Sequence, residues 1–147
     1  MVERPVENME GNMAAEAGTQ TSTVKILVYS DNRETRDEVI HALGRRIGRE
    51  GRAIEYVESA TWEGADLKVR ENDFDLLILD AETRRMGGIG LGKRVRDEID
   101  EDMPYIVLIA RPQDEWLARV SKPNAILQYP VDGRELSAAV KDILAAK

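Results

Sequence analysis

Two aspartates stand directly behind apolar segments that are typical of buried strands. Asp31 follows residues 24–30 (VKILVYS), and Asp80 ends residues 74–80 (FDLLILD). Neighbouring strands lie about 5 Å apart, so carboxylates at two such strand ends repel each other unless a cation joins them. Carboxylate oxygens suit Mg²⁺, which keeps several waters and needs only one or two carboxylates. The pair predicts a magnesium site, and the alternative is that each aspartate only ends a strand or caps a helix.

The rest of the chain alternates between strand and helix patterns. Apolar runs rich in β-branched residues predict buried strands at 24–31, 74–80 and 105–110, with weaker strands at 53–60 and 125–130. The segments between them, and the end of the chain, repeat apolar residues with helical spacing, for example Leu91, Val95 and Ile99. Five strands alternating with five helices predict an α/β, flavodoxin-like (βα)5 sandwich with a parallel sheet in the order 2-1-3-4-5. In such sheets ligands bind at the carboxyl ends of the strands, near the first and third.

Length and composition indicate one globular domain. The chain has 147 residues, of which 42% are hydrophobic and 33% charged, enough for a single core. Residues 1–23 carry few large apolar side chains, so we expect a disordered tail followed by a domain at 24–147. The chain contains no cysteine, which excludes disulfides and thiolate metal sites and is compatible with the cytoplasm.

The net charge and the hydropathy of the chain limit the classes of partner that it can bind. The net charge of -7 repels phosphate backbones, so we expect no direct contact with nucleic acid. The longest apolar runs have four or five residues, far too few to span a membrane, and the acidic N-terminus has no apolar signal region. Proteins or small ligands are the expected partners, and the cytoplasm is the expected location.

The segment from about 24 to 147 resembles the receiver domain of bacterial response regulators. The resemblance rests on KILVYSDN (25–32), FDLLILDAETRRMGGIGL (74–91), PYIVLIA (104–110) and ILQYP (126–130). LVYSDN and ARPQDEWLA also resemble stand-alone atypical receivers of actinobacteria. The resemblance implies that Asp80 is the phosphoacceptor, Asp31 an acidic metal ligand and the backbone carbonyl of Glu82 a third ligand. In that family the aspartate forms an acyl phosphate, and Mg²⁺ neutralises the phosphoryl oxygens.

Four positions depart from the family pattern. The first acidic metal position is Ser30, which weakens the expected Mg²⁺ site by one charge. The hydroxyl residue that normally ends the fourth strand is Ile109, and the switch aromatic of the fifth strand aligns with Ile126. Where the family has a lysine before a proline, this chain has Tyr129, and a neutral phenol does not replace the charge of the lysine. These losses together predict that conventional switching is impaired.

Several further residues carry narrower expectations. Arg111 or Arg84 is a candidate for a replacement cation. The family's lysine-proline bond is often cis, so we predict a cis Tyr129–Pro130 bond. Trp116 lies on the face formed by the fourth helix, fifth strand and fifth helix, where receivers bind partners, and an exposed tryptophan there is a common hot spot. The glycine-rich segment 87–92 has the wrong spacing and place for a dinucleotide loop.

Three functions remain open from the sequence. The first is a single-domain atypical receiver in two-component signalling, phosphorylated on Asp80 by a kinase or a small donor. The second is a phosphorylation-independent interaction module, with a protein target or a second copy bound at the face that includes Trp116. The third is a pseudo-receiver that binds a metabolite near Ile109, Tyr129 and Arg111. Nothing in the sequence indicates an enzyme beyond phosphorylation and dephosphorylation of the chain itself.

Overall fold

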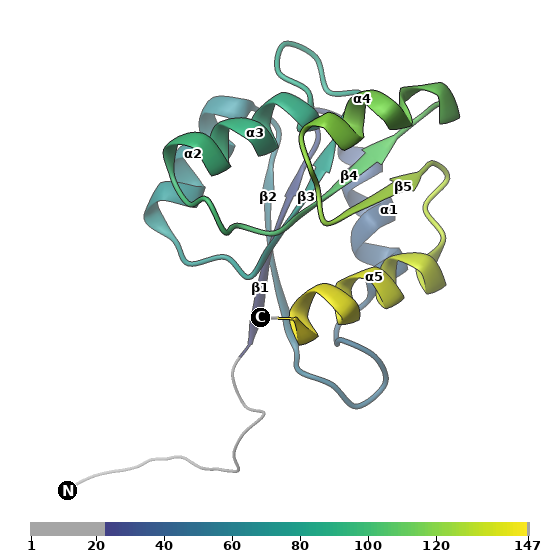
Figure 1. Ribbon diagram of the computed structural model, residues 1–147. Helices are drawn as coiled ribbons and strands as arrows, with labels where there is room; N and C mark the ends of the chain where they lie inside the picture. Colours follow the sequence, from purple (N-terminus) through teal and green to yellow (C-terminus); the bar gives the residue numbers. More distant parts are fainter. Residues whose placement is uncertain (1–22, 147) are drawn as a thin grey trace, which may run out of the picture.

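Residues 23–146, which the computed structural model describes, form a five-stranded parallel sheet between two layers of helices (Figure 1). The strands are β1 (Val24–Tyr29), β2 (Ile54–Ser59), β3 (Leu76–Asp80), β4 (Tyr105–Ile109) and β5 (Ala125–Gln128). The helices are α1 (Arg33–Leu43), α2 (Trp62–Glu71), α3 (Gly88–Glu98), α4 (Glu115–Val120) and α5 (Gly133–Ala145), with the 3₁₀ turn η1 (Pro112–Asp114) before α4. The strand order β2-β1-β3-β4-β5 confirms the predicted topology. The predicted tail at 1–23 lies outside the described residues, except for Thr23.

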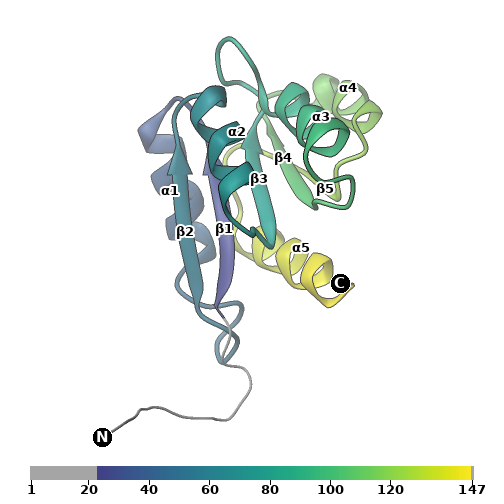
Figure 2. The ribbon, with the colours of Figure 1, turned by 90° about the vertical axis from the view of Figure 1, so that its left-hand side faces the viewer.

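Helices cover both faces of the sheet. Helices α1 and α5 pack on one face, and α2, α3 and α4 pack on the other (Figure 2). Every residue of β3 and β4 is buried, which explains their continuous apolar sequences. Strand β2 lies at the edge, and all of its residues except the buried Ser59 are half-buried or exposed, which explains its weaker signal.

Short polar side chains start three of the helices. Asn32 caps α1 by accepting a hydrogen bond from the Glu34 amide at 2.8 Å. Thr61 and Asp132 cap α2 and α5 in the same way. Because Asn32 and Asp132 follow strand ends closely, these caps also fix where the loops around the carboxyl edge of the sheet begin.

The glycines of segment 87–92 permit close packing of α3 on the sheet. A Cβ at Gly88 would lie 2.7 Å from the backbone carbon of Leu79, and one at Gly92 would lie 2.4 Å from the ring of Tyr105. Both distances are too short for non-bonded carbons, so only glycine allows this approach. The glycines therefore bring α3, and the loop before it, against the ends of β3 and β4.

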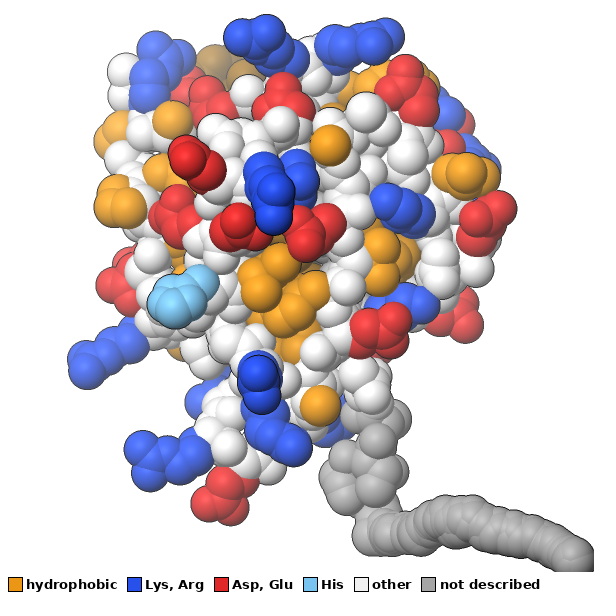
Figure 3. Space-filling view, turned by 180° about the vertical axis from the view of Figure 1, so that it is seen from behind, with side chains coloured by type: hydrophobic (Ala, Val, Ile, Leu, Met, Phe, Trp, Pro, Cys, Tyr) orange, Lys and Arg blue, Asp and Glu red, His pale blue; other side chains and the backbone are white. Residues whose placement is uncertain are grey.

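The surface carries both signs of charge. Figure 3 shows Lys, Arg, Asp and Glu side chains interspersed over the face opposite to that of Figure 1, together with the single histidine side chain. That residue, His41, is exposed on α1 and lies in no metal-binding cluster of the described residues. Within residues 23–146, no helix has the length and apolar character needed to cross a membrane.

Candidate functional site

Asp80 is a buried carboxylate at the carboxyl end of β3. Tyr29 of β1 pairs with Leu79 of β3, and this register sets Ser30 beside Asp80. The Ser30 hydroxyl donates a hydrogen bond of 2.7 Å to Asp80 Oδ2, and the Glu82 amide donates one of 2.9 Å to Oδ1. Only 4% of Asp80 is exposed. A buried carboxylate needs hydrogen-bond partners, and here these two neutral donors hold it in place.

The second predicted carboxylate, Asp31, is exposed at the same edge. Its Oδ2 accepts a hydrogen bond of 3.0 Å from the Arg84 amide, which joins the end of β1 to the loop between β3 and α3. An open hollow of about 490 Å³ lies here, lined by Asp31, Asn32, Arg33, Glu82 and Arg84. The structure thus brings Asp31, Asp80 and Glu82 to one edge, as the sequence predicted.

This edge fits a hydrated magnesium ion held by few protein ligands. Asp31 and Asp80 supply two carboxylates, which is the number that Mg²⁺ usually takes from a protein. Within residues 23–146, no three His, Cys, Asp or Glu side chains gather into a metal-binding group. An ion at this edge would therefore keep most of its waters, and Ser30 supplies a hydroxyl where the resemblance implies a third carboxylate.

Two residues that the sequence did not single out stabilise this edge. The half-buried Arg36 donates a hydrogen bond of 2.7 Å to the Ser30 carbonyl and forms an ion pair of 2.8 Å with Glu58. The Tyr29 hydroxyl donates a hydrogen bond of 2.6 Å to the Met86 carbonyl. Burial, and then the nearby carboxylates of which Asp31 is the largest contributor, raises the pKa of Tyr29 to about 12. Tyr29 directly precedes Ser30 in an apolar strand, so its sequence signal was that of a core residue.

The two predicted switch positions are apolar and packed. Ile109 is buried at the end of β4, and Ile126 of β5 packs against the same core cluster. Neither side chain has a donor for a phosphoryl oxygen. The exposed Glu82 side chain accepts a hydrogen bond of 3.3 Å from the Ala110 amide, which connects the loop after β3 to the end of β4.

Tyr129, at the position where the family resemblance implies a lysine, lies in the loop after β5. Its amide donates a hydrogen bond of 2.9 Å to the Ile109 carbonyl, and the predicted cis Tyr129–Pro130 bond is confirmed. The hydroxyl is buried and makes no hydrogen bond of ordinary geometry within the described residues. Burial raises the pKa of Tyr129, and Asp80 raises it further, first through its charge and then as a hydrogen-bond acceptor, followed by the charge of Glu38. A protonated phenol therefore lies close to the Asp80 carboxylate, without forming a hydrogen bond of ordinary geometry to it.

The two candidate replacement cations have other roles. Arg111 donates two hydrogen bonds to Asp114, from Nη2 at 2.9 Å and from Nε at 3.2 Å. These bonds raise the pKa of Arg111. Arg84 contacts Asp31 through its backbone amide. Neither the Arg84 nor the Arg111 guanidinium therefore has a described contact with Asp80.

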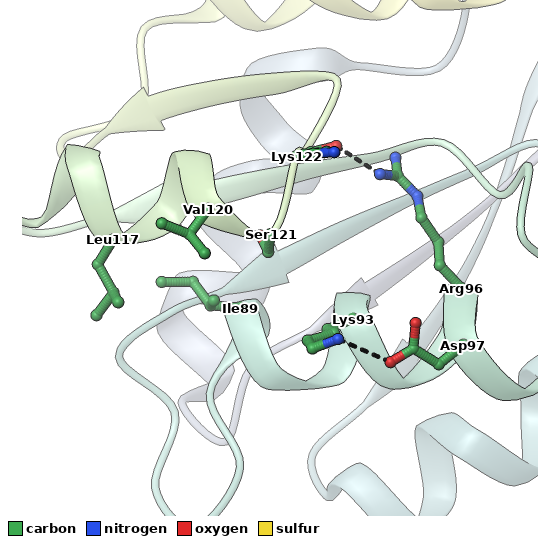
Figure 4. Close-up of a pocket in the computed structure, with 8 residues that line it drawn as sticks. All are labelled: Ile89, Lys93, Arg96, Asp97, Leu117, Val120, Ser121 and Lys122. Atoms are coloured by element: carbon green, nitrogen blue, oxygen red, sulfur yellow. Dashed lines mark hydrogen bonds and ion pairs between the residues drawn. The ribbon is translucent and has the colours of Figure 1, made fainter.

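A second feature is an apolar patch on α4. Trp116 is 70% exposed and Val120 67%, and Leu117 is half exposed. Figure 4 shows Leu117 and Val120 on α4 near Ile89 on α3, on the walls of a groove of about 470 Å³. The groove is completed by charged and polar side chains, namely Lys93, Arg96, Asp97, Ser121 and Lys122.

Known proteins with a similar sequence point to one family. The chain is 39% identical over 126 residues to an uncharacterized response regulatory protein of Mycobacterium tuberculosis, found in strains CDC 1551 and H37Rv. The match covers 86% of this chain and 95% of the relative. No protein-family model matches the chain.

Solved structures show the same fold. A CheY-like response regulator receiver domain protein from Methanospirillum hungatei superposes with a TM-score of 0.68 and 22% identity, covering 85% of this chain and 96% of the other. The receiver domain of the Francisella response regulator 1452 gives a TM-score of 0.71 and 19% identity, covering 84% and 98%.

Proposed function

The chain belongs to the response-regulator receiver family, and from that premise we propose that it is an atypical receiver that accepts a phosphoryl group on Asp80. One observation carries the proposal. Asp80 is held by hydrogen bonds from Ser30 and Glu82 at the same sheet edge as the exposed Asp31, beside an open polar hollow. A strand end alone would not require a buried, hydrogen-bonded carboxylate at this place.

The proposed reaction is transfer of a phosphoryl group to Asp80. A carboxylate oxygen forms a bond to phosphorus, while the bond between phosphorus and the donor's leaving atom breaks and that atom keeps the electron pair. A phosphorylated kinase or a small phosphodonor of the cytoplasm is the expected donor. Mg²⁺, when bound by Asp31, Asp80 and the Glu82 carbonyl, would neutralise charge on the phosphoryl oxygens. Later attack by water at phosphorus returns the carboxylate and phosphate, and we propose no other enzymatic activity.

The output of this receiver differs from that of the family. Ile109 and Ile126 place no hydroxyl and no aromatic ring at the positions through which receivers transmit phosphorylation. A ligand shifts an equilibrium only through contacts that differ between two states. We therefore propose that phosphorylation acts mainly on the edge itself, through the loops that contain Glu82 and Tyr129.

A titration followed by backbone-amide NMR tests the proposal. The protein receives Mg²⁺ and then beryllofluoride, a phosphoryl mimic, and Asp80→Asn is the control. We expect amide shifts around Asp31, Asp80 and Glu82 that the control lacks. Absence of any shift that depends on Asp80 at millimolar Mg²⁺ would overturn the proposal.

A second candidate function, a phosphorylation-independent interaction module, is favoured by the α4 patch. Three apolar side chains, Trp116, Leu117 and Val120, are exposed on one short helix, and such groups mark protein contacts more often than isolated apolar residues do. A target protein or a second copy could bind there. The metabolite-binding alternative has less support, since none of the hollows described above is lined by Ile109, Tyr129 or Arg111.

A further inference from the structure

We propose that the Tyr129 hydroxyl donates the hydrogen bond to a phosphoryl oxygen on Asp80 that the family's lysine would otherwise supply. This inference rests on the proposed function and assigns one residue to it. From the sequence alone, Tyr129 is only the loss of the lysine's charge. In this proposal it is a hydrogen-bond donor that takes over part of the lysine's role.

The Tyr129 hydroxyl lies close to Asp80 but makes no hydrogen bond of ordinary geometry. Most buried hydroxyls in folded proteins make a hydrogen bond, and one that does not pays for its desolvation without return. Among residues 23–146, only Thr83 and Tyr129 have a buried side-chain oxygen or nitrogen without such a bond. A buried donor close to the proposed phosphoacceptor that lacks a well-formed hydrogen bond is therefore an exception, and a ligand on Asp80 would satisfy it.

The backbone on both sides of the Tyr129 ring is held in place. The Tyr129 amide bonds to the Ile109 carbonyl, and the Val131 amide bonds to Glu38 of α1 at 2.8 Å. The side chain packs against the core cluster beneath α1 and α5. Because the backbone is fixed on both sides of Pro130, the hydroxyl is kept near Asp80 before any ligand arrives.

A phosphoryl group on Asp80 would supply the hydrogen-bond acceptors that the Tyr129 hydroxyl lacks. Each Asp80 oxygen already accepts a hydrogen bond, Oδ2 from Ser30 and Oδ1 from Glu82. A phosphoryl group on Asp80 adds charged oxygens to the site, and a hydrogen bond to a charged acceptor is about twice as strong as one between neutral groups. The phenol, protonated at neutral pH, would gain a well-formed hydrogen bond only in the phosphorylated state. Such a contact differs between the two states, as a switch requires.

Binding of beryllofluoride with Mg²⁺ to the full chain tests the assignment. Tyr129→Phe keeps the ring and removes only the hydroxyl. We expect this variant to bind beryllofluoride about tenfold or more weakly than wild type, the size of one hydrogen bond to a charged acceptor. Without ligand, it should be as stable as wild type or more stable, because an unpaired buried hydroxyl is removed. Tyr129→Lys should restore tight binding.

A matched control uses the other unpaired hydroxyl. The substitution Thr83→Val removes the Thr83 hydroxyl, which lies in the loop after β3. We expect the affinity of this variant for beryllofluoride to stay within about twofold of wild type. Labelling tyrosine at Cζ gives an independent readout, since the Tyr129 resonance should shift on binding in wild type and the Thr83 variant alike.

The outcomes separate the inference from the proposed function. Equal affinity of wild type and Tyr129→Phe, or a loss seen only in Thr83→Val, would overturn the role of Tyr129 and leave Asp80 as the acceptor. Failure of the wild type to bind beryllofluoride would overturn both.

Discussion

The Ser30 hydroxyl donates a hydrogen bond of 2.7 Å to Oδ2 of Asp80. Where the family resemblance implies a carboxylate that binds metal, this chain has a fully buried hydroxyl that bonds to the proposed phosphoacceptor, Asp80. The exchange removes one negative charge and also removes the repulsion between two buried carboxylates. It lowers the demand for a cation at the edge in the state without ligand.

Ser30→Asp should strengthen Mg²⁺ binding. The new carboxylate would lie against Asp80 and near Asp31, so a divalent ion would relieve their repulsion, and we expect about tenfold higher affinity, equivalent to about 1.4 kcal/mol. In the absence of Mg²⁺ the variant should unfold at a lower temperature than wild type. Ser30→Asn, of similar size but uncharged, is the control. Calorimetric titration measures the affinity, and equal affinities of Ser30→Asp and Ser30→Asn would contradict the assignment of this edge as the metal site.

Two glycines of α3 should respond oppositely to alanine. Gly88→Ala would push a Cβ to 2.7 Å from the backbone of Leu79, so we expect it to lower the free energy of unfolding by about 1–3 kcal/mol. Gly90→Ala meets only the flexible Met86 side chain, at 3.4 Å, and should be neutral or stabilise by up to about 1 kcal/mol through helix propensity. Urea unfolding of both variants measures the difference. A Gly88→Ala protein as stable as Gly90→Ala would show that α3 can shift away from the sheet.

Stability should fall at alkaline pH partly through Tyr29. Its folded pKa of about 12 exceeds the unfolded value of about 10. Between these values the native state binds more protons than the unfolded state, so the contribution of Tyr29 is complete below about pH 10 and is lost as pH rises through 12. The same sign holds for Tyr56, whose pKa burial also raises to about 12.

Tyr29→Phe tests this pH dependence. Urea unfolding at about pH 9 and about pH 11.5 should show a smaller loss of stability in the variant than in wild type, because one of the titrating groups is gone. At pH 9 the variant should be less stable by about 1 kcal/mol, because the Met86 carbonyl loses its hydrogen bond. Identical losses between the two pH values in both proteins would contradict the raised pKa.

The α4 patch should matter for association and not for stability. Trp116→Ala removes a side chain that is 70% exposed, so we expect the free energy of unfolding to change by less than about 0.5 kcal/mol. If the chain forms a homodimer through this face, the substitution should weaken it by about tenfold or more. Leu67→Ala, at an exposed leucine on α2, is the matched control. Sedimentation over a range of concentrations measures both, and a wild type that stays monomeric throughout would exclude the homodimer.

Much of the architecture was predictable because it depends on local patterns. The apolar runs that became β1, β3 and β4 are buried on both faces, and an uninterrupted apolar sequence is what such burial requires. Since the alternation of strands and helices leaves few topologies, the sheet order followed, and with it the meeting of Asp31 and Asp80 at one edge. The cis bond before Pro130 followed from the family resemblance.

The direction and partners of the site's side chains were decided only by the tertiary structure. The sequence identified Ser30 and Tyr129 as losses. The fold turns Ser30 into a donor to Asp80 and leaves the Tyr129 hydroxyl close to Asp80 without a hydrogen bond of ordinary geometry. Likewise, Arg111 was a candidate cation until its pairing with Asp114 was seen. Strand register follows from a repeating pattern, which a sequence displays. Hydrogen-bond partners depend on packing between segments far apart in the chain, so only the folded structure fixes them.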